Sequence, residues 1–493
     1  MDFNGYVEPG VYVEPGTTPT IVAPGVAPTV VCLIGNGIGY HTNSETISFA
    51  SSASAVLTQK GIDPTSIVVK GYVTDPNAAG QSIPKTFAVT TDYTVATDTS
   101  GGADNSVTTI TKASGSTIES GYPQLTVSYR YTDADYHSLH VFDDFTSFAE
   151  TYGPALDPTS GALVSPLTMA AMVALQNGAN EIWALALNPA VGTLSQQFAA
   201  AYQLLSGSNT SVNVVVPLWD GVTSGAAIAG MLATLNAALQ ADANNGVLRV
   251  ACVGLDQSYA GTPTDVAGLA TGIGSSRIVM AYPHKLNYFN GVLNQTLIAD
   301  GIYLGAGYAG ILAANDPEMP LTKKIVQGFS GVPADVATVL TQTNRKILAT
   351  GGVSVATLDR SSNLRVMQGL TTNYAGGILN REISLVRAQD ALYTMLQTTV
   401  ENSGLIGIPI GPNTALQVKS VVSGVLETAK AQGVIMDYSG LVVREQAPPS
   451  GDPTVIEVMF AYKPSWPLNY ITVSFTVDTT TGDTTTTTAT TGA

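Results

Sequence analysis

The chain has 493 residues, of which 45% are hydrophobic and only 11% are charged, against a usual charged share of about 25%. Its net charge of −16 argues against a protein that grips nucleic acid through a basic stripe, and it disfavours anionic membrane surfaces. The low charged fraction suggests that other subunits cover much of the surface. The length exceeds one ordinary core and predicts several domains.

The cysteines and the apolar segments indicate a protein of the reducing cytosol. Cys32 and Cys252 lie in apolar, strand-like runs, so we expect buried thiols and no disulfide. The first ten residues have neither a basic start nor an apolar stretch, and we expect no signal peptide. The longest nearly apolar run, Gly301–Ala314, is too short and too rich in glycine to span a bilayer.

Residues 1–28 are predicted to form an extended arm. The sequence Tyr-Val-Glu-Pro-Gly occurs in it twice, at Tyr6–Gly10 and at Tyr12–Gly16. Val, Tyr and Val alternate as in a β-strand, but the prolines exclude a place in the middle of a sheet. The arm therefore resembles a strand that has no partner nearby in the chain.

The next part of the chain is predicted to be an α/β domain with an inserted β module. Residues 29–60 open the α/β domain with the buried strand Thr29–Gly35, and residues 61–136 have the short alternating runs of a small β-sandwich. In residues 137–345, continuous apolar strands alternate with helices, which predicts a parallel sheet covered on both faces. The expected strands are Glu181–Leu187, Val212–Trp219, Gly246–Gly254 and Ser276–Tyr282, and the expected helices include Pro166–Gln176, Leu194–Leu205 and Ala226–Gln240.

Residues 346–468 are predicted to form a C-terminal α+β domain. It would contain a hairpin at Gly352–Leu370, two amphipathic helices near Ile378–Val400 and Thr414–Gln432, and the strands "SGLVVRE" and "TVIEVMFAY". Residues 469–493 follow as a second arm, with a strand at Asn469–Val477 and a threonine-rich tail.

The candidate nucleotide and metal motifs have simpler explanations. "LIGNGIGY" (Leu33–Tyr40) places glycines after a strand, but their spacing is wrong for a dinucleotide loop and no acidic residue follows at the required distance. His137 and His140 lie near Asp143 and Asp144, but strand residues three apart face opposite sides of a sheet. We therefore favour a strand-exit turn and polar residues at a domain junction.

The segment "SPLTMAAM" (Ser165–Met172) resembles the nucleophile segment of subtilisin-like proteases, with Thr168 in the place of the serine. None of the four histidines sits in a recognisable base motif, so a helix start is the better interpretation. "NDPEMP" (Asn315–Pro320) is interpreted as a rigid turn rather than a cation site. We expect no catalytic residues, no cofactor and no metal.

Five stretches of the chain share residues, in order, with one protein family. They are "PGVYVEP" in the first arm, "ILAANDPEMPLTKKIVQGFSGV", "LATGGVSVATLDRSSNLRVMQGLTT", "REISLVRAQDALYTMLQ" and "YKPSWPLNYITVSFTV". In these stretches the chain resembles contractile bacteriophage tail sheath proteins. The resemblance implies a subtilisin-like parallel-sheet domain without protease activity, an inserted β-sandwich-like module, a C-terminal α+β domain and extended terminal arms.

The resemblance also implies a function and a set of partners. The subunit would form hexameric rings stacked in a helical sheath around the tail tube protein, bounded by baseplate and tail terminator proteins. Contraction would drive the tube through the host envelope for genome ejection, with no direct contact to nucleic acid and no membrane insertion. The implied location is the virion tail, and the host cytoplasm during assembly.

The family links its subunits by strand exchange through the two arms. The matching positions here are Val11, Tyr12, Val13, Glu14, Tyr470, Ile471, Val473 and Phe475. The doubled "YVEPG" leaves two registers that present the same faces, of which we favour Val11–Val13. Two alternatives stay open: a sheath of a secretion or injection system, and a hydrolase built on the α/β domain. Both C-terminal helices are candidates for the surface that faces the tube.

Overall fold

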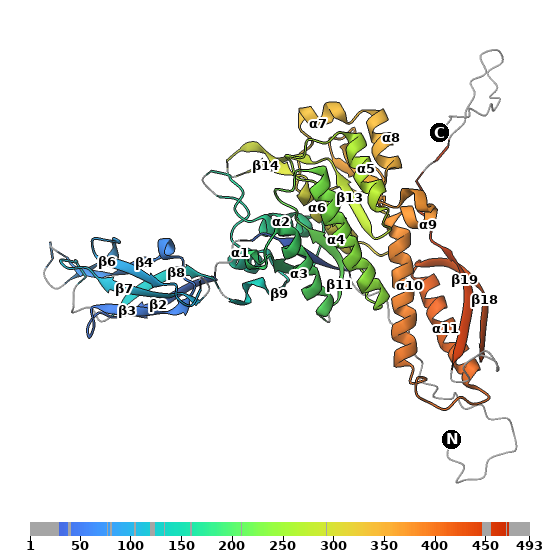
Figure 1. The fold of residues 1–493 in the computed structure, drawn as a ribbon, viewed down its shortest axis with the longest axis horizontal. Coiled ribbons are helices and arrows are strands. Elements are labelled where there is room, and N and C mark those ends of the chain that lie inside the picture. The colour runs from blue at the N-terminus through green and yellow to red at the C-terminus, as the bar shows by residue number, and fades with distance from the viewer. Residues whose placement is uncertain are drawn as a thin grey trace, which may run out of the picture. The chain divides into compact units, whose positions relative to one another are not determined.

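The computed structural model describes residues 29–37, 41–75, 77–78, 81–102, 105–118, 124–132, 134–157, 160–208, 210–291, 293–445, 455–469 and 471–472 (Figure 1). The described residues divide into two compact units, and each is considered by itself. One unit contains residues 29–383 together with 469 and 471–472, and the other contains residues 384–468. The second is called the C-terminal unit below.

The centre of the first unit is an eight-stranded sheet with the order β17-β16-β13-β12-β11-β1-β10-β9. The six central strands run parallel, and the edge strands β9 and β17 are antiparallel to their neighbours. The strands are β1 (Val30–Gly35), β9 (Leu139–Phe142), β10 (Ile182–Ala186), β11 (Val212–Pro217), β12 (Val250–Val253), β13 (Ile278–Tyr282), β16 (Val353–Leu358) and β17 (Leu364–Val366). The predicted mixture of parallel and antiparallel sheets in an α/β chain is confirmed.

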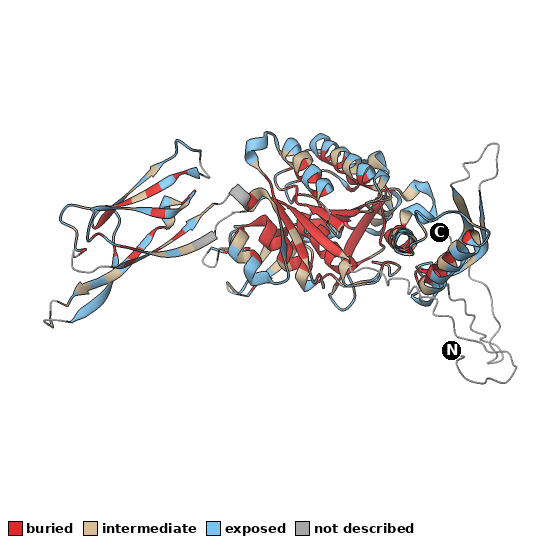
Figure 2. Ribbon diagram, turned by 90° about the horizontal axis from the view of Figure 1, so that it is seen from below, coloured by how far each residue is buried: buried red, intermediate tan, exposed pale blue. Residues whose placement is uncertain are grey.

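Helices cover both faces of this sheet, so the apolar strands are buried between two layers (Figure 2). One layer contains α2 (Pro166–Gln176) and α6 (Ile302–Ala313), and α1 (Phe145–Tyr152) packs beside α2. The other layer contains α3 (Leu194–Gly207), α4 (Gly225–Asn244), α5 (Pro263–Ile273) and α8 (Gln342–Thr350), whose apolar side chains join the strands in one core. The short helix α7 (Ala334–Val339) and the hairpin β14–β15 (Lys285–Asn290 and Gln295–Asp300) complete this part.

Helix α6 is buried on all sides, which explains its glycine-rich, nearly uncharged sequence. A Cβ atom at Gly305 would lie 2.9 Å from the carbonyl oxygen of Cys252, and one at Gly310 would lie 2.3 Å from that of Ala174. The glycines thus allow α6 to approach β12 and α2 at backbone distance. None of the described helices is long and apolar enough to cross a bilayer.

The inserted module is built from two sheets that enclose one core, as expected for a sandwich. The sheets have the orders β2-β8-β4-β5 and β3-β7-β6. The strands are β2 (His41–Ile47), β3 (Ser54–Lys60), β4 (Val68–Thr74), β5 (Ser82–Phe87), β6 (Tyr93–Asp98), β7 (Val107–Lys112) and β8 (Leu125–Tyr131).

The pairing of β2 with β8 and of β3 with β7 corrects the predicted boundary at residue 61. Residues 41–60 belong to the module, and only β1 of the predicted segment 29–60 lies in the large sheet. The sequence "HTNSETI" of β2 misled the prediction because its polar residues carry little apolar periodicity.

The predicted boundary at residue 346 is also wrong. The hairpin is present, but β16 pairs with β13 in parallel and thereby extends the large sheet. The turn between its strands is held by Asp359, whose carboxylate accepts hydrogen bonds from the backbone N–H groups of Ser361 (2.8 Å) and Asn363 (2.9 Å). A hairpin's local sequence pattern does not specify which sheet its strands join, and here the apolar run of β16 suits a buried sheet.

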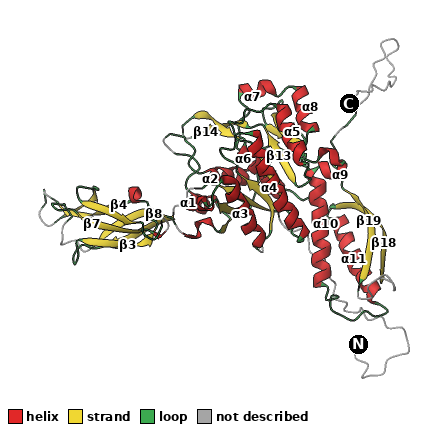
Figure 3. Cartoon of the chain, viewed as in Figure 1, coloured by secondary structure: helices red, strands yellow, loops and turns green. Residues whose placement is uncertain are grey.

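The C-terminal unit contains two helices and a two-stranded sheet (Figure 3). The elements are α10 (Ile383–Asn402), α11 (Thr414–Ala431), β18 (Ile435–Glu445) and β19 (Ile456–Pro464). The helix expected near Ile378–Val400 is divided into α9 (Ile378–Arg381) and α10, because Glu382 between them has an extended backbone.

Arg249 is the largest charged side chain in the core of the α/β layers, with 1% of its surface exposed. Its guanidinium lies 2.5 Å from the carboxylate of Asp242 and donates further hydrogen bonds to the carbonyl oxygens of Val212 (3.1 Å) and Leu205 (3.2 Å). One side chain thus links the start of β12 to β11, α3 and α4. A buried ion pair with complete hydrogen bonding is costly to break, because the remaining charge cannot reach water.

We predict that Arg249→Ala lowers the free energy of unfolding by about 3–5 kcal/mol, since it leaves Asp242 buried and unpaired. Lys285→Ala is the matched control, because Lys285 pairs at 3.0 Å with Asp335 on the surface, and it should cost about 1 kcal/mol or less. Urea denaturation followed by circular dichroism measures both. Equal losses in the two variants would contradict the assigned role of Arg249.

Candidate functional site

Among the described residues, the sheet of the C-terminal unit has no third strand on either outer edge. β18 and β19 pair with each other in antiparallel fashion, and neither pairs with a third strand among the described residues. The outer edge of each strand therefore presents backbone N–H and C=O groups that another strand can pair with. An edge of this kind is the acceptor surface required for strand addition.

The sequence of the C-terminal unit fixes one face of this sheet against the helices. The inward side chains of the sheet share a core with those of α10 and α11, namely Leu441, Val458, Phe460, Tyr462, Leu392, Met395, Val422, Val425 and Leu426. On the opposite face, Met436, Val442 and Met459 are exposed. The sheet is thus rigidly backed on one side and available on the other.

Polar contacts also fix β18 to α11. The hydroxyl of Tyr438 donates a hydrogen bond to Glu427 (2.8 Å), and Lys430 forms an ion pair with Asp437 (2.8 Å). Gly440 adopts a φ of +68° where the register between β18 and β19 shifts. The bulge increases the local twist of the strand.

The strand-exchange residues predicted from the arms mostly lie outside the described residues. This applies to Val11, Tyr12, Val13, Glu14, Tyr470, Val473 and Phe475. Ile471 is described; it is 77% exposed and lies outside any strand. The pairing of the arms stays a prediction, as does the choice between the two "YVEPG" registers.

Asn469 marks where the chain, after the C-terminal unit, again belongs to the first unit. Its side-chain amide donates a hydrogen bond to Glu382 (2.9 Å), and its amide oxygen accepts one from Thr322 (3.3 Å). Glu382 is buried, and desolvation raises its pKa. The segment before residue 470 is therefore fixed to the fold, which matters for the design of truncations.

The residues weighed for metal binding serve the local structure. His137 Nδ1 lies 3.4 Å from the carbonyl oxygen of Ala186, and His140 Nε2 lies 3.1 Å from the hydroxyl of Ser138. Asp144 caps α1 by accepting the backbone N–H of Ser147, and Asp143 is exposed beside it. No described group of metal-ligating side chains contains any of the four.

The residues weighed for hydrolysis are also structural. Ser165 caps α2 by accepting the N–H of Thr168, and the hydroxyl of Thr168 donates to the carbonyl oxygen of Gly153 (2.8 Å). Both side chains are fully buried. Cys32 and Cys252 are buried, as predicted, and form no disulfide among the described residues. Burial raises the pKa of Cys32 to about 12, far from that of a reactive thiol.

Side chains of the protein occupy the space beside the glycines at the end of β1. A Cβ atom at Gly35 would lie 2.9 Å from Leu218, and one at Gly37 would lie 2.9 Å from Leu167. Gly39 lies outside the described residues. The packing around Gly35 and Gly37 supports a turn rather than a phosphate-binding loop.

The sequence reasoning missed a group of three carboxylates. Asp220, Asp256 and Asp300 each present an oxygen atom within 4.8 Å of those of the other two. Each aspartate follows an apolar strand by a few residues or ends one, in "PLWD", "VGLD" and "LIAD". Because parallel strands bring such positions to one edge of a sheet, the pattern was a usable signal for Asp220 and Asp256, whereas Asp300 ends the antiparallel hairpin strand β15 and gave no such signal.

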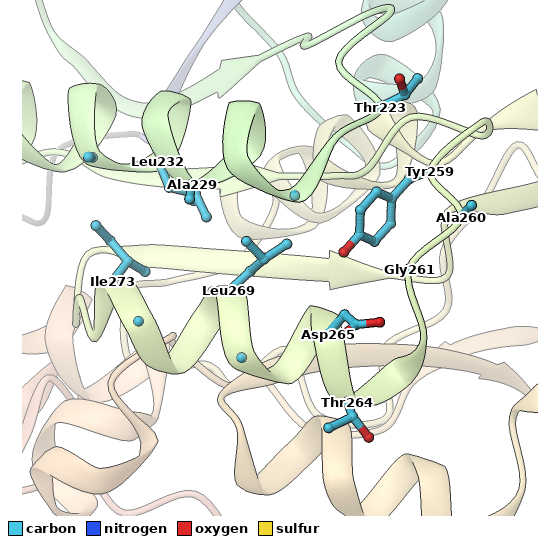
Figure 4. A pocket seen from close by; sticks show the side chains of 14 residues that line it. Thr223, Ala229, Leu232, Tyr259, Ala260, Gly261, Thr264, Asp265, Leu269 and Ile273 are labelled. Carbon is cyan, nitrogen blue, oxygen red and sulfur yellow. The ribbon is translucent and has the colours of Figure 1, made fainter.

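A groove of about 740 Å³ lies between α4 and α5. Figure 4 shows Ala229 and Leu232 of α4 facing Leu269 and Ile273 of α5 across it, with Tyr259 at one end. The carboxylate of Asp265, also in the lining, is engaged in capping α5 through Thr262. The groove therefore lacks a convergent set of free polar groups of the kind that catalysis requires.

The fold defines a multidomain α/β protein with parallel and antiparallel sheets. No protein-family model matches the chain. The tail sheath protein of Mycobacterium phage Bxz1 is 29% identical over 435 residues, which cover 87% of this chain and 71% of the phage protein. Over most of its length, the chain is therefore similar in sequence to a phage tail sheath protein.

Solved structures of contractile injection systems contain the same fold. A chain in the anti-feeding prophage baseplate matches with a TM-score of 0.52 at 14% identity, over 70% of this chain and 89% of that one. A chain in the contracted sheath complex of the PVC extracellular contractile injection system matches with a TM-score of 0.51 at 12% identity, over the same two shares. At these identities the matches show the fold alone.

We predict that Thr168→Val lowers the free energy of unfolding by about 1–3 kcal/mol, because the carbonyl oxygen of Gly153 loses its donor. Neither wild type nor variant should hydrolyse a generic ester or peptide substrate. Thr146→Val, on the exposed side of α1, is the control and should change stability little. A wild-type activity that Thr168→Val abolishes would instead favour the hydrolase.

Proposed function

We propose that this chain is the structural subunit of a contractile phage tail sheath. It polymerises helically around the tail tube and contracts to drive the tube through the host envelope for DNA delivery. The homology to a phage tail sheath protein supports this proposal, and so does the fold shared with chains of contractile injection systems. The observation that carries the mechanism is the two-stranded sheet with both edges open.

Subunits are joined by strand exchange. Val11–Glu14 of one copy and the strand around Tyr470–Phe475 of another add to the edges of β18 and β19 in a neighbour. Backbone hydrogen bonds then supply the affinity, and alternating side chains supply the register. The proline- and glycine-rich segment 15–28 lets each core rotate while the strand contacts persist.

Contraction releases a conformational difference stored across many equivalent interfaces. It needs no nucleotide in this chain, and the sequence contains no P-loop. The hexameric rings, the tail tube, the baseplate and terminator partners, and the location in the virion tail and host cytoplasm belong to the same proposal. So does the subtilisin-like character of the α/β domain, which acts here as a scaffold.

We predict that deleting residues 1–20 abolishes the assembly of long tubular sheaths, and that deleting residues 473–493 does the same. The first deletion removes one donated strand, and the second shortens the other by removing Val473 and Phe475. The chain that carries the second deletion ends at Thr472 and therefore retains Asn469 with its hydrogen bond to Glu382. Negative-stain electron microscopy of the purified variants measures the length of the assemblies.

Circular dichroism must show that both truncated chains keep the secondary structure of the full chain. If folded variants of both kinds still form long tubes, the strand-exchange mechanism is wrong. The sheath function itself would survive that result if the tubes still contract around a tail tube.

We predict that co-assembly with the tail tube weakens as salt increases. The net charge of −16 favours a complementary basic patch on the tube, and its attraction is screened beyond about 8 Å at physiological ionic strength. Co-sedimentation of the subunit with purified tube between low and high salt gives the measurement. Co-assembly that is indifferent to salt would refute the charge argument.

A further inference from the structure

Three loops meet at the carboxyl edge of the large sheet, and each contributes one aspartate. Asp220 follows β11, Asp256 follows β12, and Asp300 ends β15 just before α6. One carboxylate oxygen from each lies within 4.8 Å of the oxygens of the other two. Asp256 and Asp300 are each 5% exposed, and Asp220 is partly buried.

Glycines hold these loops together at backbone distance. A Cβ atom at Gly254 would lie 2.0 Å from the carbonyl oxygen of Gly301, and one at Gly301 would lie 2.5 Å from the Cα of His284. The N–H of Gly301 also donates to the carbonyl oxygen of His284 (2.8 Å). Asp256 and Asp300 are two and one residues from these glycines, so the backbone packing forces their carboxylates together.

The carboxylates receive too little compensation for three buried negative charges. Asp256 accepts the N–H groups of Gly221 and Ser258 (both 2.7 Å), and Asp300 accepts that of Ile302 (3.1 Å). Asp220 accepts no hydrogen bond from the described residues, and no ion pair among them includes any of the three. Burial and repulsion from Asp256 and Asp220 raise the pKa of Asp300 to about 7. Burial and repulsion from Asp256 also raise the pKa of Asp220.

The hydroxyl of Tyr303 is a second buried polar group near the three carboxylates. Tyr303, in the first turn of α6, is 2% exposed, and its hydroxyl has no hydrogen-bond partner in the described part of the chain. Burial raises the pKa of Tyr303, and the charges of Asp300, Asp220 and Asp256 add to this rise, so the phenol lies within electrostatic range of the three carboxylates. A buried hydroxyl without a partner is unusual in a folded protein and points to a missing neighbour.

We propose that Asp220, Asp256 and Asp300 bind a Ca²⁺ ion, with the Tyr303 hydroxyl bonded to a water molecule in its coordination shell. Ca²⁺ prefers carboxylate oxygens and tolerates irregular geometry. Opposite ligands of Ca²⁺ lie about 4.8 Å apart, whereas those of Mg²⁺ lie about 4.2 Å apart. Three carboxylate oxygens that all lie within 4.8 Å of one another can bind a single ion, and the irregular donor set favours Ca²⁺, which tolerates flexible geometry.

The ion joins the loops after β11, β12 and β15, and it replaces repulsion between their carboxylates by attraction. Its role is structural: it stabilises the carboxyl edge of the sheet and the start of α6. The proposal does not depend on the sheath function, because it rests on this edge of the first unit alone.

The test uses the full-length protein, freed of metal with a chelator. Isothermal titration with CaCl₂ should show saturable binding, and the Tm should rise by at least about 2 °C at saturation. MgCl₂ should bind at least about tenfold more weakly. Asp300→Asn and Asp220→Asn should each weaken Ca²⁺ binding at least about tenfold, as should Tyr303→Phe through the lost contact with the bound water.

Stability without metal separates binding from a merely structural role. In the chelator, Asp300→Asn should melt at or above the wild-type temperature, because it removes one of three repelling charges. Asp143→Asn, an exposed aspartate on the surface, is the matched control and should keep wild-type Ca²⁺ affinity. The proposal is overturned if metal-free wild type shows no saturable Ca²⁺ binding, or if Asp300→Asn and Asp220→Asn both bind Ca²⁺ as wild type does.

Discussion

Backbone N–H and C=O groups at the edge of a β-sheet need hydrogen-bond partners, and the two main sheets of this protein differ in how that need is met. In the large sheet, the outer edge of β17 is covered by the chain itself. The N–H groups of Lys323 and Val326 donate to the carbonyl oxygens of Val366 and Leu364 (both 2.8 Å). The three-residue strand β17 is therefore not an open edge. By contrast, β18 and β19 are 11 and 9 residues long, and no described segment covers either outer edge.

Long uncovered edges are normally selected against, because they recruit other chains. A protein that retains them, and also exposes Met436, Val442 and Met459 on the adjoining face, has a surface suited to association. The charged share of 11% agrees with this interpretation, since a surface that is covered in an assembly needs fewer charges for solubility.

The sequence predicted the individual helices and strands better than it predicted which strands pair with each other. The parallel strands were recognisable because burial on both faces requires continuous apolar runs, as in β1 and β11. β2 escaped recognition because its polar residues give no such run, and β16 was placed in the wrong domain because pairing between distant strands leaves no local trace. Arg249 and the three aspartates were missed for a related reason. Their roles arise only when the fold brings separate loops into contact.

The carboxyl edge of the parallel sheet shows how a shared architecture can lack chemistry. In many α/β proteins this edge holds the reacting groups. Here it holds three carboxylates and a buried tyrosine, while burial lowers the pKa of the nearby His284. The one candidate nucleophile segment lies at the start of α2, where Thr168 is sealed by its bond to Gly153. Buried carboxylates of this kind, with Thr168 bonded into the backbone, suit ion binding better than bond cleavage.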